Sequence, residues 1–477
     1  MAEIPDTIER QRKQAHSTET DKLGTEKISK LLAQYAIPSV IGMLAMSLYN
    51  LVDSIFIGKG VGPLALSALA LAIPIMNLSS AFSLLIGVGA AAQMSIRLGR
   101  GDNQSAKLIL GNMVVLSTVI GVAFTILMLV FLDEILVLLG ASGQTMDYAR
   151  DFLRIILWGS VVSMVFMGLN SVMRATGYPQ KSMTIMLSSI VVNCILAPLF
   201  IFGFRWGVRG AAFATLTAQV IALSFEIVHY TRKKHFIHFV PGIYKLKGHI
   251  VKGILEIGLS PFILNVCASI VVIFINHALL RYGGDLHVGA YGIINRYLFV
   301  FTMTVIGINQ GVQPIIGYNY GACKLDRMVR ALKQAIVWAT CVTAMGGFAG
   351  LLFPTHIAQM FTSDPDLIAA TVEGFSYTLF LFPLVGFQIL SSSFFQSIDK
   401  AQKSILLSIT RQVVFLIPLL VVLPSFWGVR GVWVSMPIAD FFAILLAVML
   451  ITGQLRKMGI WRKDKSPNTT HEDACPL

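Results

Sequence analysis

The sequence predicts an all-α polytopic membrane protein with twelve transmembrane helices, arranged as two six-helix repeats. Its 477 residues are 55% hydrophobic and 13% charged, whereas soluble domains carry about 25% charged residues. Twelve apolar segments are long enough to cross a bilayer, and several short motifs recur about 222 residues apart. This composition excludes soluble globular, disordered, coiled-coil and disulfide-scaffold classes.

The twelve segments follow from length, because a helix needs about 20 apolar residues to cross a hydrocarbon core of about 30 Å. They lie at 33–57, 65–88, 108–132, 152–173, 182–203, 210–230, 254–280, 288–316, 332–353, 370–395, 404–424 and 431–453. We expect an N-lobe at 33–231 and a C-lobe at 253–454, with cytoplasmic tails at 1–32 and 455–477 and a cytoplasmic connector at 232–252. No cleaved signal peptide is expected, because the first thirty residues are polar.

The basic residues predict the orientation. The chain has 37 Lys and Arg against 24 Asp and Glu, a formal net charge of +13. With both termini in the cytoplasm, and with residues at span ends counted in the adjoining loop, 28 of the 37 fall in inner tails and loops, seven in outer loops, and two, Arg296 and Arg411, deep within spans. This bias is the positive-inside rule. It predicts a multi-pass protein of the cell (inner) membrane with both termini cytoplasmic, and it explains the basic charge without nucleic acid.

Internal symmetry predicts how the two halves are related. W-G-V-R-G occurs at 206–210 and 427–431, Q-K-S at 180–182 and 402–404, and Gly89, Gly99 and Pro38 recur as Gly311, Gly321 and Pro261. Convergent loop composition is the weaker alternative. Because six spans is an even number, both halves enter the membrane from the same side. They should be related by a pseudo-two-fold axis along the membrane normal, with a cavity between them, as in parallel-repeat transporters.

Asp53 is the leading candidate for function, because an ionisable group within a span is costly and is a functional candidate by default. It lies near the outer end of the first span, and its counterpart in the second half is Asn276. The carboxylate therefore occurs in one half only, which favours ion coupling over a purely structural aspartate. A buried carboxyl that binds a cation outside and releases it inside could drive a second solute outward.

Three neutral polar residues of the same half are expected around Asp53. Asn170, Asn193 and Thr215 lie in the fourth, fifth and sixth spans. Their oxygens would complete a small polar pocket, although each could instead be a hydrogen bond between helices.

Other polar residues at membrane depth have plainer interpretations. Arg411 and Asp440 have depths that allow a structural ion pair between the last two spans. Asn276, Arg296 and Gln310 are candidates for lining the substrate cavity, although Arg296 could instead snorkel outward. Glu226 near the inner boundary is expected to be solvated or paired with the basic connector.

The sequence contains no enzyme motif of the H-E-x-x-H, G-x-S-x-G or Walker type. No Cys/His spacing indicates a metal site. We therefore expect no enzyme, no cofactor and no bound metal, and uphill transport would depend on an ion gradient.

These features together resemble the MATE family of multidrug and toxic compound extrusion antiporters, and within it the DinF-like branch. The resemblance extends from about residue 34 to residue 456. It is carried by Y-N-L-V-D-S-I-F-I-G at 49–58, the loop at 99–102, N-C-I-L-A-P-L-F-I-F-G at 193–203, both W-G-V-R-G motifs and G-I-N-Q-G-V-Q-P-I-I-G-Y-N-Y-G-A at 307–322.

The resemblance implies the MATE/MOP fold and export of cationic drugs and dyes in exchange for H⁺ or Na⁺. Asp53 falls on the coupling aspartate of the first helix and Pro38 on the bend of that helix. Asn170, Asn193 and Thr215 fall on the polar positions around it. The chain departs from many relatives at Ala197, where they carry a second aspartate, and at Ser269, where one branch places a glutamate.

These departures favour H⁺ as the coupling ion, with Na⁺ as the alternative, and leave coupling to Asp53. The protein is expected to act as a monomer in the lipid bilayer. A lipid-linked oligosaccharide flippase of the wider superfamily is the main alternative function, but it should need a basic cavity. A membrane-embedded enzyme is a weaker one.

Overall fold

The computed structural model describes residues 18–233 and 235–459, which are almost entirely helical and contain no β-strand. The first half comprises α2 (Thr18–Thr25), α3 (Ile28–Gly60), α4 (Pro63–Gly99), α5 (Asn103–Val130), α6 (Leu132–Leu138), α7 (Met146–Trp158), α8 (Ser160–Ala175), α9 (Pro179–Pro198), the π-helix η1 (Leu199–Gly203) and α10 (Gly207–Thr231). The second comprises α11 (Gly248–Gly321), α12 (Leu325–Leu352), α13 (Pro354–Gln359), α14 (Pro365–Thr378), α15 (Phe382–Ser397), α16 (Ala401–Ile409), the π-helix η2 (Thr410–Leu416), α17 (Ile417–Trp427) and α18 (Val429–Lys457).

All twelve predicted spans are helical. Nine helices of the described chain are long and apolar enough to cross a membrane, and two further spans are pairs bent by 49° (α7 and α8) and 55° (α14 and α15). The remaining span is hidden within α11, whose 74 residues would measure about 110 Å if straight. At Gly284 the backbone is not helical, with φ +69° and ψ −172°. A positive φ favours glycine, and here it divides α11 into the seventh and eighth spans.

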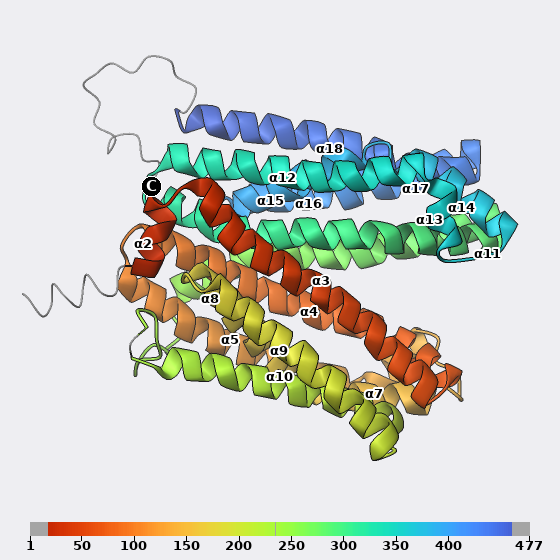
Figure 1. Cartoon of the computed structure of the whole chain (residues 1–477), viewed down its shortest axis with the longest axis horizontal. Helices are drawn as coiled ribbons and strands as arrows, with labels where there is room; N and C mark the ends of the chain where they lie inside the picture. Colours follow the sequence, from red (N-terminus) through yellow and green to blue (C-terminus); the bar gives the residue numbers. More distant parts are fainter. Residues whose placement is uncertain (1–17, 234, 460–477) are drawn as a thin grey trace, which may run out of the picture.

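The helices form two lobes (Figure 1). Helices α5, α8, α9 and α10 lie in the first, and α12, α15, α16 and α18 in the second. We call the end of the molecule that holds α2 and Lys457 the terminal end, and the end that holds α6 and α13 the distal end. The lobes meet at the terminal end and their helices diverge toward the distal end.

Helix α3 joins the two lobes. Its first half packs on the second lobe, where the backbone near Ala36 and Val40 touches Gly311 and Gly307. Its last half packs on α9 of the first lobe, and Figure 1 shows it running obliquely between the two. Pro38 is buried between these contact points, and α3 continues through it as one helix.

The terminal end is tightly packed because glycines let the lobe backbones touch. A Cβ atom on Gly89 would overlap the carbonyl of Ile254, and one on Gly258 would overlap the carbonyl of Leu85. Close approach of this kind is a common use of small residues between membrane helices. Three of the recurrent glycines, Gly89, Gly99 and Gly321, lie at this contact between the lobes, and the fourth, Gly311, lies against α3.

Two segments at the terminal end of the molecule are more closely packed against the lobes than the predicted tail and connector imply. Within the expected tail, α2 packs on the second lobe, where Asn319 Nδ2 donates a 2.9 Å hydrogen bond to the carbonyl of Leu23. The expected connector contains the start of α11, which begins at Gly248 with Ile250 and Ile254 buried. The seventh helix therefore begins before the span expected at 254–280 and includes the last residues of the expected connector.

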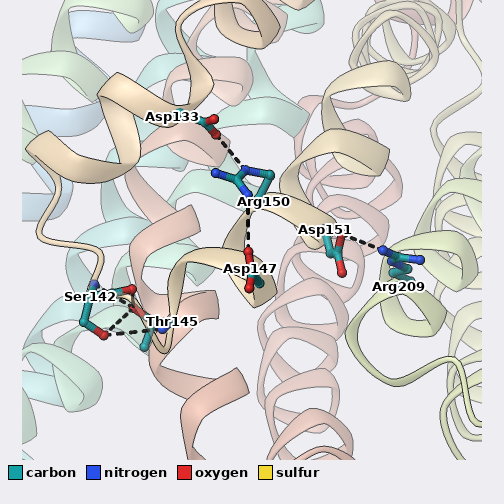
Figure 2. A network of polar contacts seen from close by, with 7 residues as sticks. All are labelled: Asp133, Ser142, Thr145, Asp147, Arg150, Asp151 and Arg209. Atoms are coloured by element: carbon teal, nitrogen blue, oxygen red, sulfur yellow. Dashed lines mark hydrogen bonds and ion pairs between the residues drawn. The ribbon is translucent and has the colours of Figure 1, made fainter.

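Ion pairs hold the distal end of the first lobe (Figure 2). Arg150 Nε lies 2.8 Å from Asp133 Oδ1, and Arg209 of α10 lies 2.9 Å from Asp151 of α7. The hydrogen bond from Arg150 lowers the pKa of Asp133. These ion pairs connect α6, α7 and α10 at this end. Because they are exposed, they contribute little to the free energy of unfolding.

Candidate functional site

Asp53 lies on α3, seven residues before its distal end at Gly60. The side chain is partly buried, and its Oδ1 atom is buried with no hydrogen-bond partner among the described residues. It is close enough to interact electrostatically with the Tyr49 hydroxyl and with Cys194. Because buried polar atoms in folded proteins are nearly always paired, this unpaired oxygen makes Asp53 the leading candidate among the described residues for a functional role.

One helical turn before Asp53, three side chains form a hydrogen-bonded cluster. The Tyr49 and Thr215 hydroxyls lie 3.0 Å apart. Asn193 Nδ2 donates to Thr215 Oγ1 at 3.0 Å and to Tyr49 Oη at 3.3 Å. The cluster therefore joins α3, α9 and α10 beside the carboxyl group, and it includes two of the three residues expected there.

Tyr49 was not among the predicted site residues. A signal for it exists in the sequence, because Tyr49 and Asp53 are four residues apart and so lie on the same face of one helix. Its hydroxyl is the only group of α3 that bonds to both Asn193 and Thr215 in the described chain.

The structure does not bring Asn170 to this cluster, which corrects the expected pocket. Asn170 bonds to Ser182 and Glu226. Ser182 precedes Asn193 by eleven residues on α9, a rise of about 16 Å. Asn170 lies three residues before the inner end of its predicted span, 152–173, and its side chain belongs to another cluster nearer the terminal end. Glu226 belongs to that cluster and is 0% exposed, so it is not solvated as we expected.

The candidates in the second lobe lie in different surroundings. Gln310 Nε2 lies 3.6 Å from the sulfur of Met43 on α3, so it is at the junction between the lobes. Asn276 is partly buried and Arg296 is exposed. Neither makes a hydrogen bond or ion pair with a residue that the structure describes.

The predicted ion pair between the last two spans is confirmed. Arg411 Nε of η2 lies 2.7 Å from Asp440 Oδ1 of α18. This contact neutralises both charges at membrane depth and removes Arg411 from the groups that could bind a transported solute.

Few groups near Asp53 could hold a metal ion. In the described ranges there is no group of three or more His, Cys, Asp or Glu side chains arranged for a metal. Ala197, one turn after Asn193, is buried and has no side-chain oxygen. A cation larger than a proton would therefore depend on one carboxylate and neutral oxygens.

A polar pocket at the terminal end lies between the lobes and was not predicted. It has a volume of about 290 Å³ and is lined by charged side chains of both lobes, including Arg97, Lys252 and Asp399. Gln93 Nε2 of α4 donates a 3.3 Å hydrogen bond to Asp399 Oδ1, in the turn after α15. Burial raises the pKa of Asp399.

A family model gives the decisive comparison. The model named MatE matches residues 38–199 and 257–422, that is, one match in each lobe. The chain belongs to the MatE family. This membership, together with the helices described above, makes it a multi-pass membrane transporter.

Relatives with known names are similar in sequence to this protein over most of its length. The multidrug export protein MepA of Staphylococcus haemolyticus is 30% identical over 429 residues, 89% of this chain and 93% of that protein. MepA of Staphylococcus aureus is 26% identical over 424 residues, with the same coverage of both chains.

Solved structures show the same fold. A multidrug resistance MATE family transporter of the MOP superfamily, described as outward-facing, has a TM-score of 0.86 and 25% identity over 92% of this chain and 98% of its own. A MATE transporter described as in the bent conformation has a TM-score of 0.86 and 26% identity, over 92% and 97%. The two-repeat MATE/MOP architecture is therefore confirmed, while the DinF-like branch stays a prediction.

Proposed function

We propose that this MatE protein is a multidrug efflux transporter of the cytoplasmic (inner) membrane. It exports organic cations and dyes in exchange for protons, by alternating access of a cavity between its lobes. The observation that carries the proposal is the Asp53 carboxyl, with its unpaired buried oxygen beside the Tyr49 cluster. The names of the relatives, which are multidrug export proteins, support the choice of substrates.

The mechanism follows from the free energy of a charge at membrane depth. Ionised Asp53 is costly to bury, whereas the protonated form is neutral and needs only a hydrogen bond. A proton bound at Asp53 therefore favours the conformation in which this site is most enclosed. If an organic cation and a proton favour different conformations of the lobes, the gradient of one can drive transport of the other.

The distribution of contacts supports an orientation. We assign the terminal end to the cytoplasm, because α2, Lys457 and most of the basic loops lie there. The lobes touch at this end through Gly89 and Gly258, whereas Asp53 lies toward the other end. Both features fit a conformation open to the outside, as described for one of the similar structures.

Protons are the coupling ion that best fits this donor set. Na⁺ prefers several oxygen ligands, but Ala197 supplies none and Asp53 is the only carboxylate that we place here. No cofactor is needed for the proposed cycle, and one chain holds both lobes, so we propose a monomer. A lipid-linked oligosaccharide flippase is less favoured, because of the two basic residues placed deep within spans, Arg411 is paired with Asp440 and Arg296 alone has no ion pair among the described residues.

The test is dye efflux from proteoliposomes in which pH and sodium gradients are imposed separately. We expect an inward proton gradient to drive efflux of an ethidium-like cation, and Asp53→Asn to abolish it. Asp285→Asn, which removes an exposed carboxyl at the distal turn of α11, should keep wild-type efflux. Efflux driven by sodium alone would overturn the choice of proton. Normal efflux by Asp53→Asn would overturn the role of Asp53.

A further inference from the structure

A second buried carboxyl lies in the first lobe, apart from Asp53. Glu226 of α10 is 0% exposed. Asn170 Nδ2 donates a 3.0 Å hydrogen bond to its Oε1 atom. The other oxygen, Oε2, is buried and has no hydrogen-bond partner among the described residues. Because an unpaired buried carboxylate oxygen is costly, this atom needs an explanation.

Arg174 lies near enough to Glu226 to interact with its charge, but its hydrogen bonds reach the carboxyl only through Asn170. Arg174 donates to Asn170 Oδ1 at 2.5 Å, and also to the Ser182 hydroxyl at 3.2 Å and the Ser171 hydroxyl at 3.1 Å. No ion pair within 4.0 Å joins Arg174 to Glu226 in the described chain. The Asn170 amide lies between the two charges, so the carboxyl oxygen Oε2 is free to bind a proton.

The second lobe contains the same hydrogen bonds without the charges. Ser392, Gln396 and Ser404 lie 222 residues after Asn170, Arg174 and Ser182. The Ser392 and Ser404 hydroxyls are 3.0 Å apart, and Gln396 Nε2 donates to Ser404 Oγ at 3.2 Å.

The carboxyl has no counterpart in that second cluster. In the W-G-V-R-G register of 221 residues, Glu226 corresponds to Ala447, which is also 0% exposed. Neutral side chains thus join α15 and α16, the counterparts of α8 and α9, and Ala447 of α18 adds no polar group to them. A buried carboxyl at this depth is therefore a feature of the first lobe alone.

Glu226 lies on the same helix faces as the cluster beside Asp53. Eleven residues separate Thr215 from Glu226 on α10, and eleven separate Ser182 from Asn193 on α9. Eleven residues make three turns, so each pair shares a face, with a rise of about 16 Å. The two polar clusters therefore form two layers between α9 and α10, one toward each end of the lobe.

Titratable groups continue from Glu226 toward the terminal end. His229 lies three residues later on α10, and its ring stacks on that of His235 with centroids 4.0 Å apart. The Tyr178 hydroxyl lies 3.1 Å from His235 Nδ1. The centroid of the Tyr178 ring lies 4.8 Å from the centroid of the His229 ring. The groups that interact with Glu226 are Asn170 and Arg174 from α8 and Tyr230 from α10. Ser182 of α9 bonds to Arg174, and His229 and Tyr178 follow Tyr230 toward the terminal end.

We propose that Glu226 is a second proton-binding carboxyl, which exchanges one proton with water at the terminal end during the transport cycle. The inference rests on the proposed proton-coupled function. The proton binds Oε2 and makes the carboxyl neutral. On release it passes toward His229 and Tyr178, and the negative charge left behind is balanced by Arg174 through the Asn170 amide.

Infrared difference spectroscopy tests this directly on the purified protein. A pH titration in H₂O and D₂O reports the carbonyl band of each carboxyl as it becomes protonated. We expect one band to be lost in Glu226→Gln and to remain in Asp53→Asn and in Glu134→Gln, which removes an exposed carboxyl on α6. Glu226→Asp should shift the band without losing it, which covers the case in which the Gln variant does not fold. A spectrum unchanged by either variant of Glu226 would overturn the proposal.

Transport gives a second measurement that a structural role would not affect in the same way. In proteoliposomes, Glu226→Gln should lose the dependence of efflux on the pH at the terminal side and keep the dependence on the opposite side. A structural residue would lower efflux equally at all pH values, and that result would also overturn the proposal. The infrared result does not require transport. A protein that shows the Glu226 band but no proton-driven efflux would contradict the proposed function alone.

Discussion

Gly99 of α4 lies directly against the backbone carbonyl of Tyr318, in α11 of the other lobe. The same contact occurs with the lobes exchanged, because Gly321 lies against the carbonyl of Ile96. Both glycines and both carbonyl residues are related by 222 positions. The pseudo-two-fold axis therefore passes between these two contacts, at the terminal end where the lobes meet.

The lobe contact should not tolerate a side chain. In Gly99→Ala the added methyl would overlap the Tyr318 carbonyl, so α4 and α11 must separate at the terminal end. We expect a lower thermal midpoint and a larger distance between spin labels placed on the two lobes at this end. Gly453→Ala on α18 is the matched control, because nothing lies within 4 Å of its added methyl. An unchanged distance in Gly99→Ala would show that this contact does not hold the lobes together.

The Tyr49 hydroxyl should contribute to transport through its hydrogen bonds. Tyr49→Phe keeps the ring but leaves Asn193 and Thr215 without that partner. A net hydrogen bond contributes about 1 kcal/mol, so proton-driven efflux should fall roughly fivefold while protein yield stays the same. Tyr148→Phe on the exposed face of α7 is the control. Full efflux by Tyr49→Phe would exclude the hydroxyl from the site.

The pair of Arg411 and Asp440 should affect stability more than transport. Arg411→Met leaves the Asp440 carboxylate unpaired at membrane depth, which we expect to cost about 3 kcal/mol. The double variant Arg411→Met with Asp440→Leu removes both charges and should recover most of that loss. The free energy of unfolding of the single and the double variant is measured in detergent with increasing denaturant. If the double variant were less stable than Arg411→Met, the pair would not be the simple structural contact that its geometry indicates.

Asp102 should make stability depend on pH in the acid range. It caps α5, because its side chain accepts a 3.0 Å hydrogen bond from the backbone N–H of Ser105. This bond, helped by Arg97 and Arg100, lowers the pKa of Asp102 in the folded state. The stabilisation is complete above the unfolded value of about 3.9, and it is lost as the pH falls through the lower folded value.

Asp102→Asn keeps a capping side chain but removes this titration. Its thermal midpoint should therefore fall less between neutral pH and pH 3 than that of the wild type. Asp102→Ala should already lose about 1 kcal/mol at neutral pH, because the cap is gone. Parallel pH curves for the wild type and Asp102→Asn would mean that this carboxylate does not carry the acid dependence.

Much of the fold could be predicted, because a segment that crosses the bilayer can be recognised from its own length and hydrophobicity. Each apolar segment must satisfy its own backbone hydrogen bonds as a helix, so the spans were identifiable from length alone. The division of α11 was also predictable, as two separate spans, although its position at Gly284 was not. The pairing of Arg411 with Asp440 followed from their depths and from the cost of leaving either charge alone.

The site was predicted only in part. Asn193 and Thr215 were expected near Asp53 and lie together one turn from it, but Tyr49 was missed and Asn170 lies in another cluster. Depth along a helix can be counted in residues, whereas the direction of a side chain around the helix axis depends on how neighbouring helices pack. For Asn170 depth alone already separates it from Asp53, because Asn170 lies three residues from the inner end of its span and bonds there to Ser182 and Glu226.

The sequence by itself determined the number of spans, their repeat and the single carboxylate near the end of the first span. These properties depend on hydrophobicity and spacing, which are local. Only the tertiary structure decided that Glu226 is buried away from the basic connector, that Tyr49 completes the cluster beside Asp53, and that the lobes touch through glycine backbones at one end. Those features depend on contacts between residues far apart in the chain, and no local pattern records which faces of the helices meet.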